Sequence, residues 1–252
     1  MKRNNIFIRF FTVISIFSCF NTLQDSIGQT TYHLSWKKDA PIAGATLGIG
    51  TAAFFLHKQK GALTEADIAA LQITDVNRFD RSATHQWNPK IATASDIGWY
   101  SSMAMPALLF IDKSVRQEYG SILTMWSETM LSTMAITTLT KNTVNRTRPY
   151  VYNSDVPISE KIDKDATASF FSGHTSMTSA SCFFTAKIYA DMHPDSRFKP
   201  LVWTGAALLP ATVGIFRYKA GKHYLTDIIT GYAVGALIGI LVPQIHKIVD
   251  KP

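Results

Sequence analysis

The chain has 252 residues, of which 46% are hydrophobic and 17% are charged, and its formal net charge is +7. The charged fraction lies below the roughly 25% of typical soluble domains, whereas a mean hydropathy of +0.06 is low for a deeply embedded membrane protein. Composition therefore leaves open a membrane-embedded bundle and a domain beside a membrane. The basic residues are scattered, which excludes a nucleic-acid partner and fits a phosphorylated substrate or a phospholipid surface.

Residues 1–28 have the pattern of a signal peptide. Three basic residues precede an apolar run at 10–20 that is too short to span a bilayer, and small residues precede a cleavage point after Gly28. We therefore predict an exported protein of the cell envelope. Its one remaining cysteine, Cys182, cannot form an internal disulfide and is predicted to be buried.

Six apolar stretches follow, and their length without strand-like alternation predicts helices. They cover residues 42–56, 97–111, 121–140, 175–190, 201–216 and 225–245. The predicted fold is all-α, a bundle of about six helices that is partly or wholly transmembrane. We divide the chain into the signal peptide (1–28), an N-terminal helix with a polar connecting segment (29–96), and the main helical bundle (97–252).

The first of these helices is the weakest candidate for a membrane span. Its 15 residues, 42–56, reach only about 22 Å, which is short of the ~30 Å hydrocarbon core. The sequence leaves open whether it crosses; if it does not cross, all three motifs described below face the periplasm. Residues 225–245 are the most convincing span. In the polar segment that follows, Thr64 and Asp67 resemble a helix capping pair.

The first chemical motif is KNTVNRTRP at residues 141–149. Lys141 and Arg148 are seven residues apart, about two helical turns, which predicts one shared face. Pro149 disfavours helix at Arg148, so the helix is predicted to end there. Two cations at a helix end can clamp a phosphate, although basic residues also simply cap helix C-termini.

The second motif is Ser172-Gly173-His174, directly before the helix predicted from residue 175. Ser172 suits the N-cap position, where free N–H groups bind anions, and Gly173 permits close backbone approach. His174 could protonate a leaving oxygen. The alternative is an ordinary helix cap beside an exposed histidine.

The third motif contains Arg217, His223 and Asp227. His223 and Asp227 are four residues apart and share a face if helical, so the carboxylate can fix the imidazole tautomer and leave one nitrogen free to attack. Arg217 adds a guanidinium for phosphoryl oxygens. The alternative is a surface helical pair. Between the first two motifs, residues 150–171 lack periodicity and are predicted to form a loop over the site.

Together the motifs read Lys-x6-Arg-Pro, Ser-Gly-His and Arg-x5-His-x3-Asp. This ordered set resembles the signature of the type 2 phosphatidic acid phosphatase (PAP2) family, also called the acid phosphatase/vanadium haloperoxidase superfamily. The resemblance covers about residues 121–245. Two positions depart from the family pattern: Phe171 stands where Pro is frequent, and Phe216 stands where Ser is frequent.

The resemblance implies a role for each motif residue. His223 is the implied nucleophile, Asp227 orients it, and His174 protonates the leaving group. The implied phosphate-binding residues are Lys141, Arg148, Ser172, Gly173 and Arg217. No metal or other cofactor is implied, because these cations supply the charge that metal ions supply elsewhere.

We therefore predict a metal-independent phosphatase that acts on a phosphomonoester or pyrophosphate, with a membrane lipid as the favoured substrate. The predicted location is the membrane, with the active site facing the periplasm. A periplasmic acid phosphatase on soluble phosphomonoesters, a vanadium-dependent haloperoxidase and a non-enzymatic scaffold that binds anionic lipid are the alternatives. The scaffold is disfavoured because binding alone requires neither a nucleophile nor a proton donor.

Overall fold

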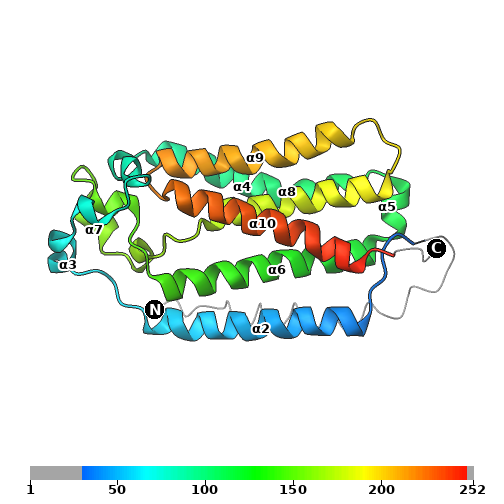
Figure 1. The fold of residues 1–252 in the computed structure, drawn as a ribbon, viewed down its shortest axis with the longest axis horizontal. Helices are drawn as coiled ribbons and strands as arrows, with labels where there is room; N and C mark the ends of the chain where they lie inside the picture. Colours follow the sequence, from blue (N-terminus) through cyan, green and yellow to red (C-terminus); the bar gives the residue numbers. More distant parts are fainter. Residues whose placement is uncertain (1–29, 249–252) are drawn as a thin grey trace.

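The computed structural model describes residues 30–248, and within that range the fold is an all-α bundle, as predicted. Six long helices run side by side along the molecule (Figure 1). They are α2 (Trp36–Gln59), α4 (Pro89–Leu109), α6 (Tyr119–Val144), α8 (Gly173–Met192), α9 (Lys199–Lys219) and α10 (Leu225–His246). Each contains all or most of one predicted apolar stretch.

Short helices lie at the two ends of the bundle. Helix α3 (Glu65–Ala70) opens with a capping box between Thr64 and Asp67, as predicted. The other short α-helices are α5 (Lys113–Gln117) and α7 (Ile158–Lys161), and the 3-10 turns are η1 (Ile73–Asp75), η2 (Arg81–His85), η3 (Pro149–Tyr152) and η4 (Lys164–Thr167).

Consecutive long helices alternate in direction, so the connections gather at two ends (Figure 1). The end with α3 and α7, here the α7 end, contains the C-termini of α2, α6 and α9 and the N-termini of α4, α8 and α10. The opposite end, the α5 end, contains the start of α2 and the end of α10. The three motifs lie at the C-termini of α6 and α9 and at the N-termini of α8 and α10. The topology therefore places all of them at the α7 end.

Helices α8 and α10 pack backbone against backbone. Three α10 glycines spaced four residues apart face α8: Gly231, Gly235 and Gly239. A Cβ atom at any of them would lie under 3.0 Å from a backbone oxygen of Ser172, Ser176 or Ala180. This close approach lets the Ser172 N–H donate to the carbonyl of Asp227 at 3.0 Å, which fixes the second motif beside the third.

The core between the helices is apolar. Met125 of α6 packs with Phe184 and Ile188 of α8 and with Val242 of α10, and all four are buried. Cys182 is fully buried, as predicted, in a neighbouring cluster. Burial of these side chains holds the helices in register and thereby fixes the positions of the motif residues.

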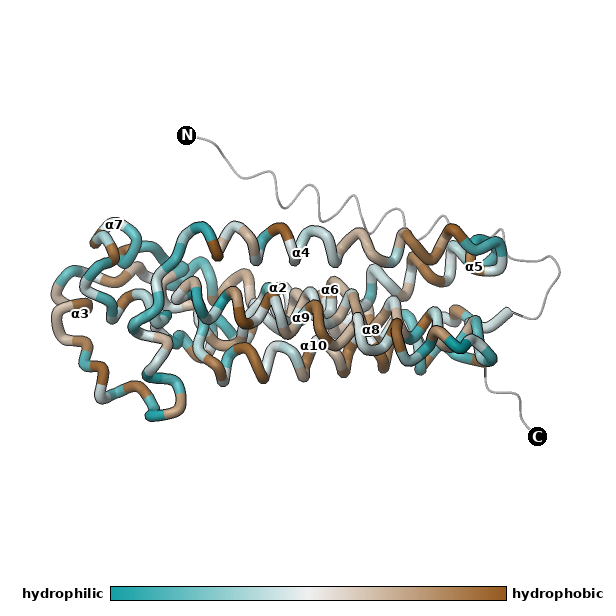
Figure 2. The backbone as a smooth tube through the Cα atoms, turned by 90° about the horizontal axis from the view of Figure 1, so that it is seen from above, coloured by the Kyte–Doolittle hydropathy of each residue, from teal (hydrophilic) through white to brown (hydrophobic). Residues whose placement is uncertain are grey.

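Three of the described helices are long and apolar enough to cross a membrane: α2, α9 and α10. The most apolar is α10, in agreement with the prediction for residues 225–245. The prediction that the first helix is too short was wrong. Helix α2 has 24 residues, about 36 Å at 1.5 Å per residue, because polar residues on both sides of the apolar run are also helical. Apolar residues are frequent along the helices between more hydrophilic ends (Figure 2).

Candidate active site

The structure brings all eight predicted site residues to the α7 end. Lys141 lies in the last turn of α6, and Arg217 in the last turn of α9. Ser172 caps α8, while Asp227 lies in the first turn of α10 with His223 just before that helix. Chain segments far apart in sequence thus meet at one place.

The predicted geometry of the first motif was wrong in one respect. Helix α6 ends at Val144, and Asn145 adopts the left-handed conformation with φ 50°. Arg148 is therefore extended, with φ −73° and ψ 152°, and shares no helical face with Lys141. The left-handed residue ends the helix before the proline restriction applies, and the chain then turns Arg148 back over the site.

Arg148 is held by residues of the segment 150–171, which was predicted to form a loop over the site. Its Nε donates to the Asp165 carbonyl at 2.8 Å and its Nη2 to the Asp165 carboxylate at 2.7 Å. Its Nη1 donates to the carbonyl of Lys222, next to His223, at 3.2 Å. The guanidinium is 4% exposed, whereas the Asp165 side chain is 66% exposed. Its carboxylate partner therefore lies on the solvent side.

The start of α8 provides the small, polar part of the site. The Ser172 hydroxyl accepts from the backbone N–H of Thr175 and lies 2.9 Å from the Thr175 hydroxyl. A Cβ atom at Gly173 would lie 3.9 Å from Lys141 Nζ, so the amine of the first motif lies directly beside this glycine. Lys141 Nζ also donates to the Ala168 carbonyl at 2.9 Å.

His174 and Arg217 share a partner that the sequence did not reveal. His174 Nε2 lies 2.7 Å from Asp96 Oδ1 on α4, and Arg217 Nη1 lies 3.4 Å from the same oxygen. Arg217 Nη1 also donates to the Ser95 hydroxyl at 3.2 Å. A serine on another helix thus contacts this arginine, although Phe216 replaces the serine frequent at that position in the family.

His223 is almost completely buried, and its Nδ1 lies 3.5 Å from Asp227 Oδ2. That carboxylate is strongly fixed. Asp227 Oδ2 accepts from the Ser169 hydroxyl at 2.6 Å and from the Tyr224 N–H at 3.0 Å. Its Oδ1 accepts from Arg146 Nη1 at 2.6 Å. Each site histidine therefore faces a carboxylate, Asp227 for His223 and Asp96 for His174.

A second ion pair lies behind Asp227. Arg146 Nη2 donates to Asp80 at 2.7 Å, and its guanidinium lies over the Tyr224 ring, 4.0 Å from the centroid. Asp80 is fully buried and also accepts from the backbone N–H and hydroxyl of Thr226. This network joins the polar segment before α4 to the first turn of α10, and it fixes the carboxylate that faces His223.

The cations change the acid–base properties of the histidines. Burial first, and then Arg148, Lys141 and Arg217, lower the pKa of His223 well below its usual value of 6.5. Burial and Arg217 lower the pKa of His174 to about 4, although Asp96 acts in the opposite direction. Burial and Arg148 lower the pKa of Lys141 to about 7. An anion bound among these groups would offset the repulsion between them.

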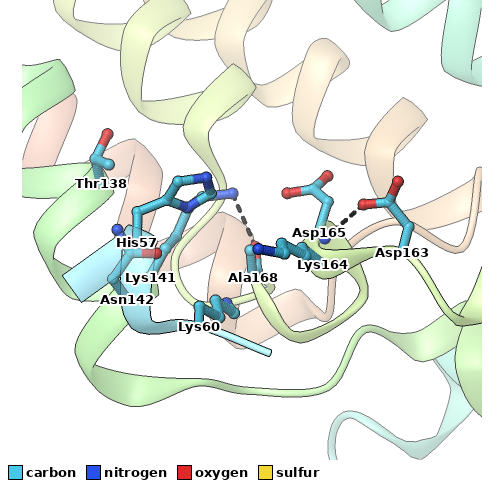
Figure 3. A pocket seen from close by; sticks show the side chains of 9 residues that line it. All are labelled: His57, Lys60, Thr138, Lys141, Asn142, Asp163, Lys164, Asp165 and Ala168. Carbon is cyan, nitrogen blue, oxygen red and sulfur yellow. Dashed lines mark hydrogen bonds between the residues drawn. The ribbon is translucent and has the colours of Figure 1, made fainter. Parts of the chain in front are cut away.

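A cavity of about 430 Å³ opens beside Lys141. Figure 3 shows that α2, α6 and the segment 150–171 contribute its lining side chains. They are His57, Lys60, Thr138, Lys141, Asn142, Asp163, Lys164, Asp165 and Ala168. Among the eight predicted site residues, Lys141 lines this cavity, which reaches from there to α2.

Several contacts escaped prediction because nothing in the local sequence marks them. Asp96, Ser169 and Asp80 reach the site from segments without a motif. Lys222 has no role in the motif pattern, yet its Nζ lies 4.8 Å from the Trp87 ring centroid and 4.5 Å from that of Tyr150. Arg146 lies within the first motif, but at a position that the pattern Lys-x6-Arg-Pro leaves unspecified.

Buried cations beside two histidine–carboxylate pairs are typical of a phosphate-handling site on a helical bundle. The chain matches the family model described as PAP2 superfamily over residues 123–250, and it belongs to that superfamily. It is a phosphoric ester hydrolase, as predicted. It is also similar to the solved structure of a transmembrane PAP2-type phosphatidylglycerolphosphate phosphatase from Bacillus subtilis, with 18% identity and a TM-score of 0.49 over 84% of this chain and 96% of that one.

Proposed function

We propose that this enzyme hydrolyses a phosphomonoester or pyrophosphate on a membrane lipid through a phosphohistidine at His223. The observation that supports this most strongly is the burial of His223 between a fixed carboxylate and three cations. A neutral imidazole in that position is a nucleophile at a site that attracts phosphate. The eight motif residues take the roles that the family resemblance implies.

In the first step, the phosphoryl group lies among Lys141, Arg148 and Arg217, with the Ser172 hydroxyl and the Gly173 N–H on its oxygens. His223 Nδ1 lies 3.5 Å from Asp227 Oδ2, and with the proton on Nδ1 the lone pair is on Nε2, which attacks phosphorus. The bond from phosphorus to the leaving oxygen breaks, and His174 transfers its proton to that oxygen.

In the second step, water attacks the phosphohistidine. His174, now neutral, takes a proton from the water, the bond between phosphorus and His223 Nε2 breaks, and inorganic phosphate leaves. Asp227 stabilises the positive charge that His223 carries in the intermediate, and Arg146, Ser169 and the Tyr224 N–H hold that carboxylate in place. The cations of the site make a catalytic metal unnecessary.

The lipid substrate is supported by the apolar outer surface of the bundle. Leu201 and Leu208 on α9 and Ile229 and Leu237 on α10 are exposed on two of the three candidate spans. With these helices in a membrane, the end of the bundle that contains the site would lie beside the lipid headgroups. Phosphatidate, phosphatidylglycerol phosphate, an isoprenyl pyrophosphate and lipid A all fit this chemistry.

The decisive experiment replaces the nucleophile. His223→Ala should abolish phosphate release from every substrate in a detergent screen without added metal, whereas His193→Ala, at the other end of the bundle, should leave it unchanged. Turnover in His223→Ala close to that of the wild type would overturn the mechanism. Faster release from soluble monoesters than from every lipid would favour the periplasmic acid phosphatase alternative.

The haloperoxidase alternative has its own test, because vanadate would occupy the phosphate position in both cases. We expect vanadate to inhibit phosphate release and to support no halide oxidation. Peroxide-dependent halide oxidation by the vanadate-loaded protein would contradict the phosphatase assignment.

We further propose that the active site faces the periplasm, which the family resemblance supports. The start of α2 lies at the α5 end, so if α2 crosses the membrane, residues 30–35 and the active site lie on opposite sides (Figure 1). Cleavage after Gly28, in a segment outside the described residues, would then conflict with a periplasmic site. Labelling of Asp155→Cys but not Asp195→Cys by an impermeant maleimide, in a background without native cysteines, would support the proposal. The mass of the purified chain tests the cleavage.

A further inference from the structure

A second group of ionisable side chains, two buried and one partly exposed, lies toward the α5 end, away from the phosphatase site. Asp39 of α2, Glu128 of α6 and His246 of α10 each direct one ligand atom to a common point, and these atoms all lie within 4.8 Å of one another. His246 Nε2 is 2.8 Å from Asp39 Oδ1 and 3.6 Å from Glu128 Oε2. Three helices therefore contribute one donor each.

Glu128 is the unexplained member of this group. Its side chain is 2% exposed, and neither carboxylate oxygen has a hydrogen-bond partner within residues 30–248. A buried carboxylate without a hydrogen bond is costly unless a positive charge compensates it. The carboxylate points at the same histidine nitrogen that faces Asp39, so the required positive charge belongs between these three side chains.

The ring of His246 is oriented for such a role. Its Nδ1 lies 2.8 Å from the Val242 carbonyl oxygen, which can only accept, so Nδ1 carries a proton. Nε2 is then the nitrogen that faces both carboxylates. Metal-binding histidines generally use this arrangement, with one ring N–H on a backbone carbonyl and the other nitrogen on the ion.

The His193–Asp112 pair serves as a comparison for the His246–Asp39 pair. His193 Nδ1 lies 3.1 Å from the Tyr189 carbonyl and Nε2 lies 2.8 Å from Asp112, which reproduces the His246–Asp39 geometry. His193 is 25% exposed and faces one carboxylate, whereas His246 is fully buried and faces two. Simple helix-end pairing accounts for His193 but not for the second carboxylate, Glu128, which has no hydrogen-bond partner within residues 30–248.

We propose that Asp39, Glu128 and His246 bind a divalent transition-metal ion such as Zn²⁺, which fastens α2 to α6 and α10. One imidazole and two carboxylates are a common donor set for such ions. Ligand atoms at 2.0–2.2 Å from a tetrahedral ion are about 3.4 Å apart. The two separations from His246 Nε2 are 2.8 Å to Asp39 and 3.6 Å to Glu128, and small side-chain movements would bring all three atoms to that spacing. Asp39 is partly exposed and provides the entry route, and a water molecule can complete the coordination.

A fastening at this point suits the weak attachment of α2. Ala53 is the one fully buried residue of this 24-residue helix. Its polar contacts with α6 include the Thr46–Ser132 hydroxyl pair and the Asn142 amide on the Ala53 carbonyl. Helix α2 also lines the cavity beside Lys141 through His57, so the ion would secure one wall of that cavity from the opposite end.

The test uses the full chain in detergent, stripped with a chelator and then dialysed against Zn²⁺. We expect one tightly bound Zn²⁺ per chain and a melting temperature several degrees above that of the stripped protein. Glu128→Gln, which keeps the shape and removes the charge, should weaken Zn²⁺ binding by at least about 10-fold. His193→Ala should bind like the wild type.

Equal Zn²⁺ content in the wild type and Glu128→Gln, or a wild-type melting temperature that does not respond to Zn²⁺, would overturn the proposal and leave a protonated His246 as the compensating charge. If Glu128→Gln does not fold, the visible spectrum of the Co²⁺-loaded wild type decides. Absorption bands of Co²⁺ bound by imidazole and carboxylate support the site, and their absence overturns it. Activity is not the readout, so the outcome is independent of the phosphatase proposal.

Discussion

The two ends of the bundle differ in how they satisfy buried charge. At the α5 end, Asp191 accepts from Tyr32, Lys187 and Lys247, so one carboxylate has three side-chain donors. At the α7 end, by contrast, a buried hydrogen-bond donor lacks an acceptor. Arg217 Nε has no hydrogen-bond partner in the described part of the chain. The two ends belong to the same helices, so the difference lies in the residues at the helix ends.

This contrast distinguishes a structural charge cluster from a binding site. A saturated carboxylate such as Asp191 needs nothing further and stabilises the fold. A buried guanidinium with a free donor destabilises the empty protein and is compensated when an anion arrives. The same criterion, applied at the α5 end, singles out Glu128 as a carboxylate that lacks a cation.

The largest effect that we expect in testing this contrast is a loss of kcat when the proton donor is replaced. His174→Gln should lower kcat by about 10²- to 10⁴-fold for a substrate with a poor leaving group, because the leaving oxygen then departs without a proton. For p-nitrophenyl phosphate, whose leaving group needs little protonation, the loss should be much smaller. An equal loss with both substrates would show that His174 binds or positions the phosphate rather than protonating the leaving group.

The next prediction compares one cation from each end. Arg217→Ala should lower kcat/KM by about 10²- to 10³-fold, because one preorganised donor to the phosphoryl oxygens is lost, with little change in melting temperature. Lys187→Met should do the reverse, since Asp191 loses a donor at a cost of about 1–3 kcal/mol in the free energy of unfolding.

Phosphate release per folded molecule and thermal unfolding in detergent measure both variants. The contrast between the ends fails if Arg217→Ala is as strongly destabilised as Lys187→Met. It also fails if Lys187→Met loses activity while it remains folded.

The sequence predicted the six long helices and the end of the bundle at which the motifs meet, because apolar periodicity and helix-end residues are local signals. It did not predict the length of α2, whose first turns at Trp36–Pro41 are helical without being uniformly apolar. Nor did it predict that Asn145 ends α6 early, since the left-handed conformation depends on how the next segment folds back.

The contacts of Asp96 and Ser169 could not be predicted from the sequence for a different reason. Asp96 contacts His174 across 78 residues of sequence, and Ser169 contacts Asp227 across 58. Such contacts are set by the packing of α4 and the 150–171 segment against α8 and α10. Single polar residues in segments without periodicity give no sign of the partner that they will meet.

The smallest expected effect tests one of these unpredicted partners through pH. The proton donor must be protonated, and the pKa of His174 is already lowered to about 4, so the alkaline limb of kcat/KM should lie below pH 6.5. Asp96 stabilises the protonated imidazole; Asp96→Asn should therefore lower that pKa further and move the limb to lower pH by about one unit. The neutral nucleophile needs no such help, since burial and then the cations keep the pKa of His223 low.

Asp155→Asn is the matched control, because Asp155 is an exposed carboxylate at the same end and its one side-chain contact is with Ser154. Its alkaline limb should coincide with that of the wild type. If Asp96→Asn lowers the rate without moving the limb, Asp96 acts on Arg217 rather than on His174. The α7 end would then contain one acid–base pair, His223 with Asp227, instead of two.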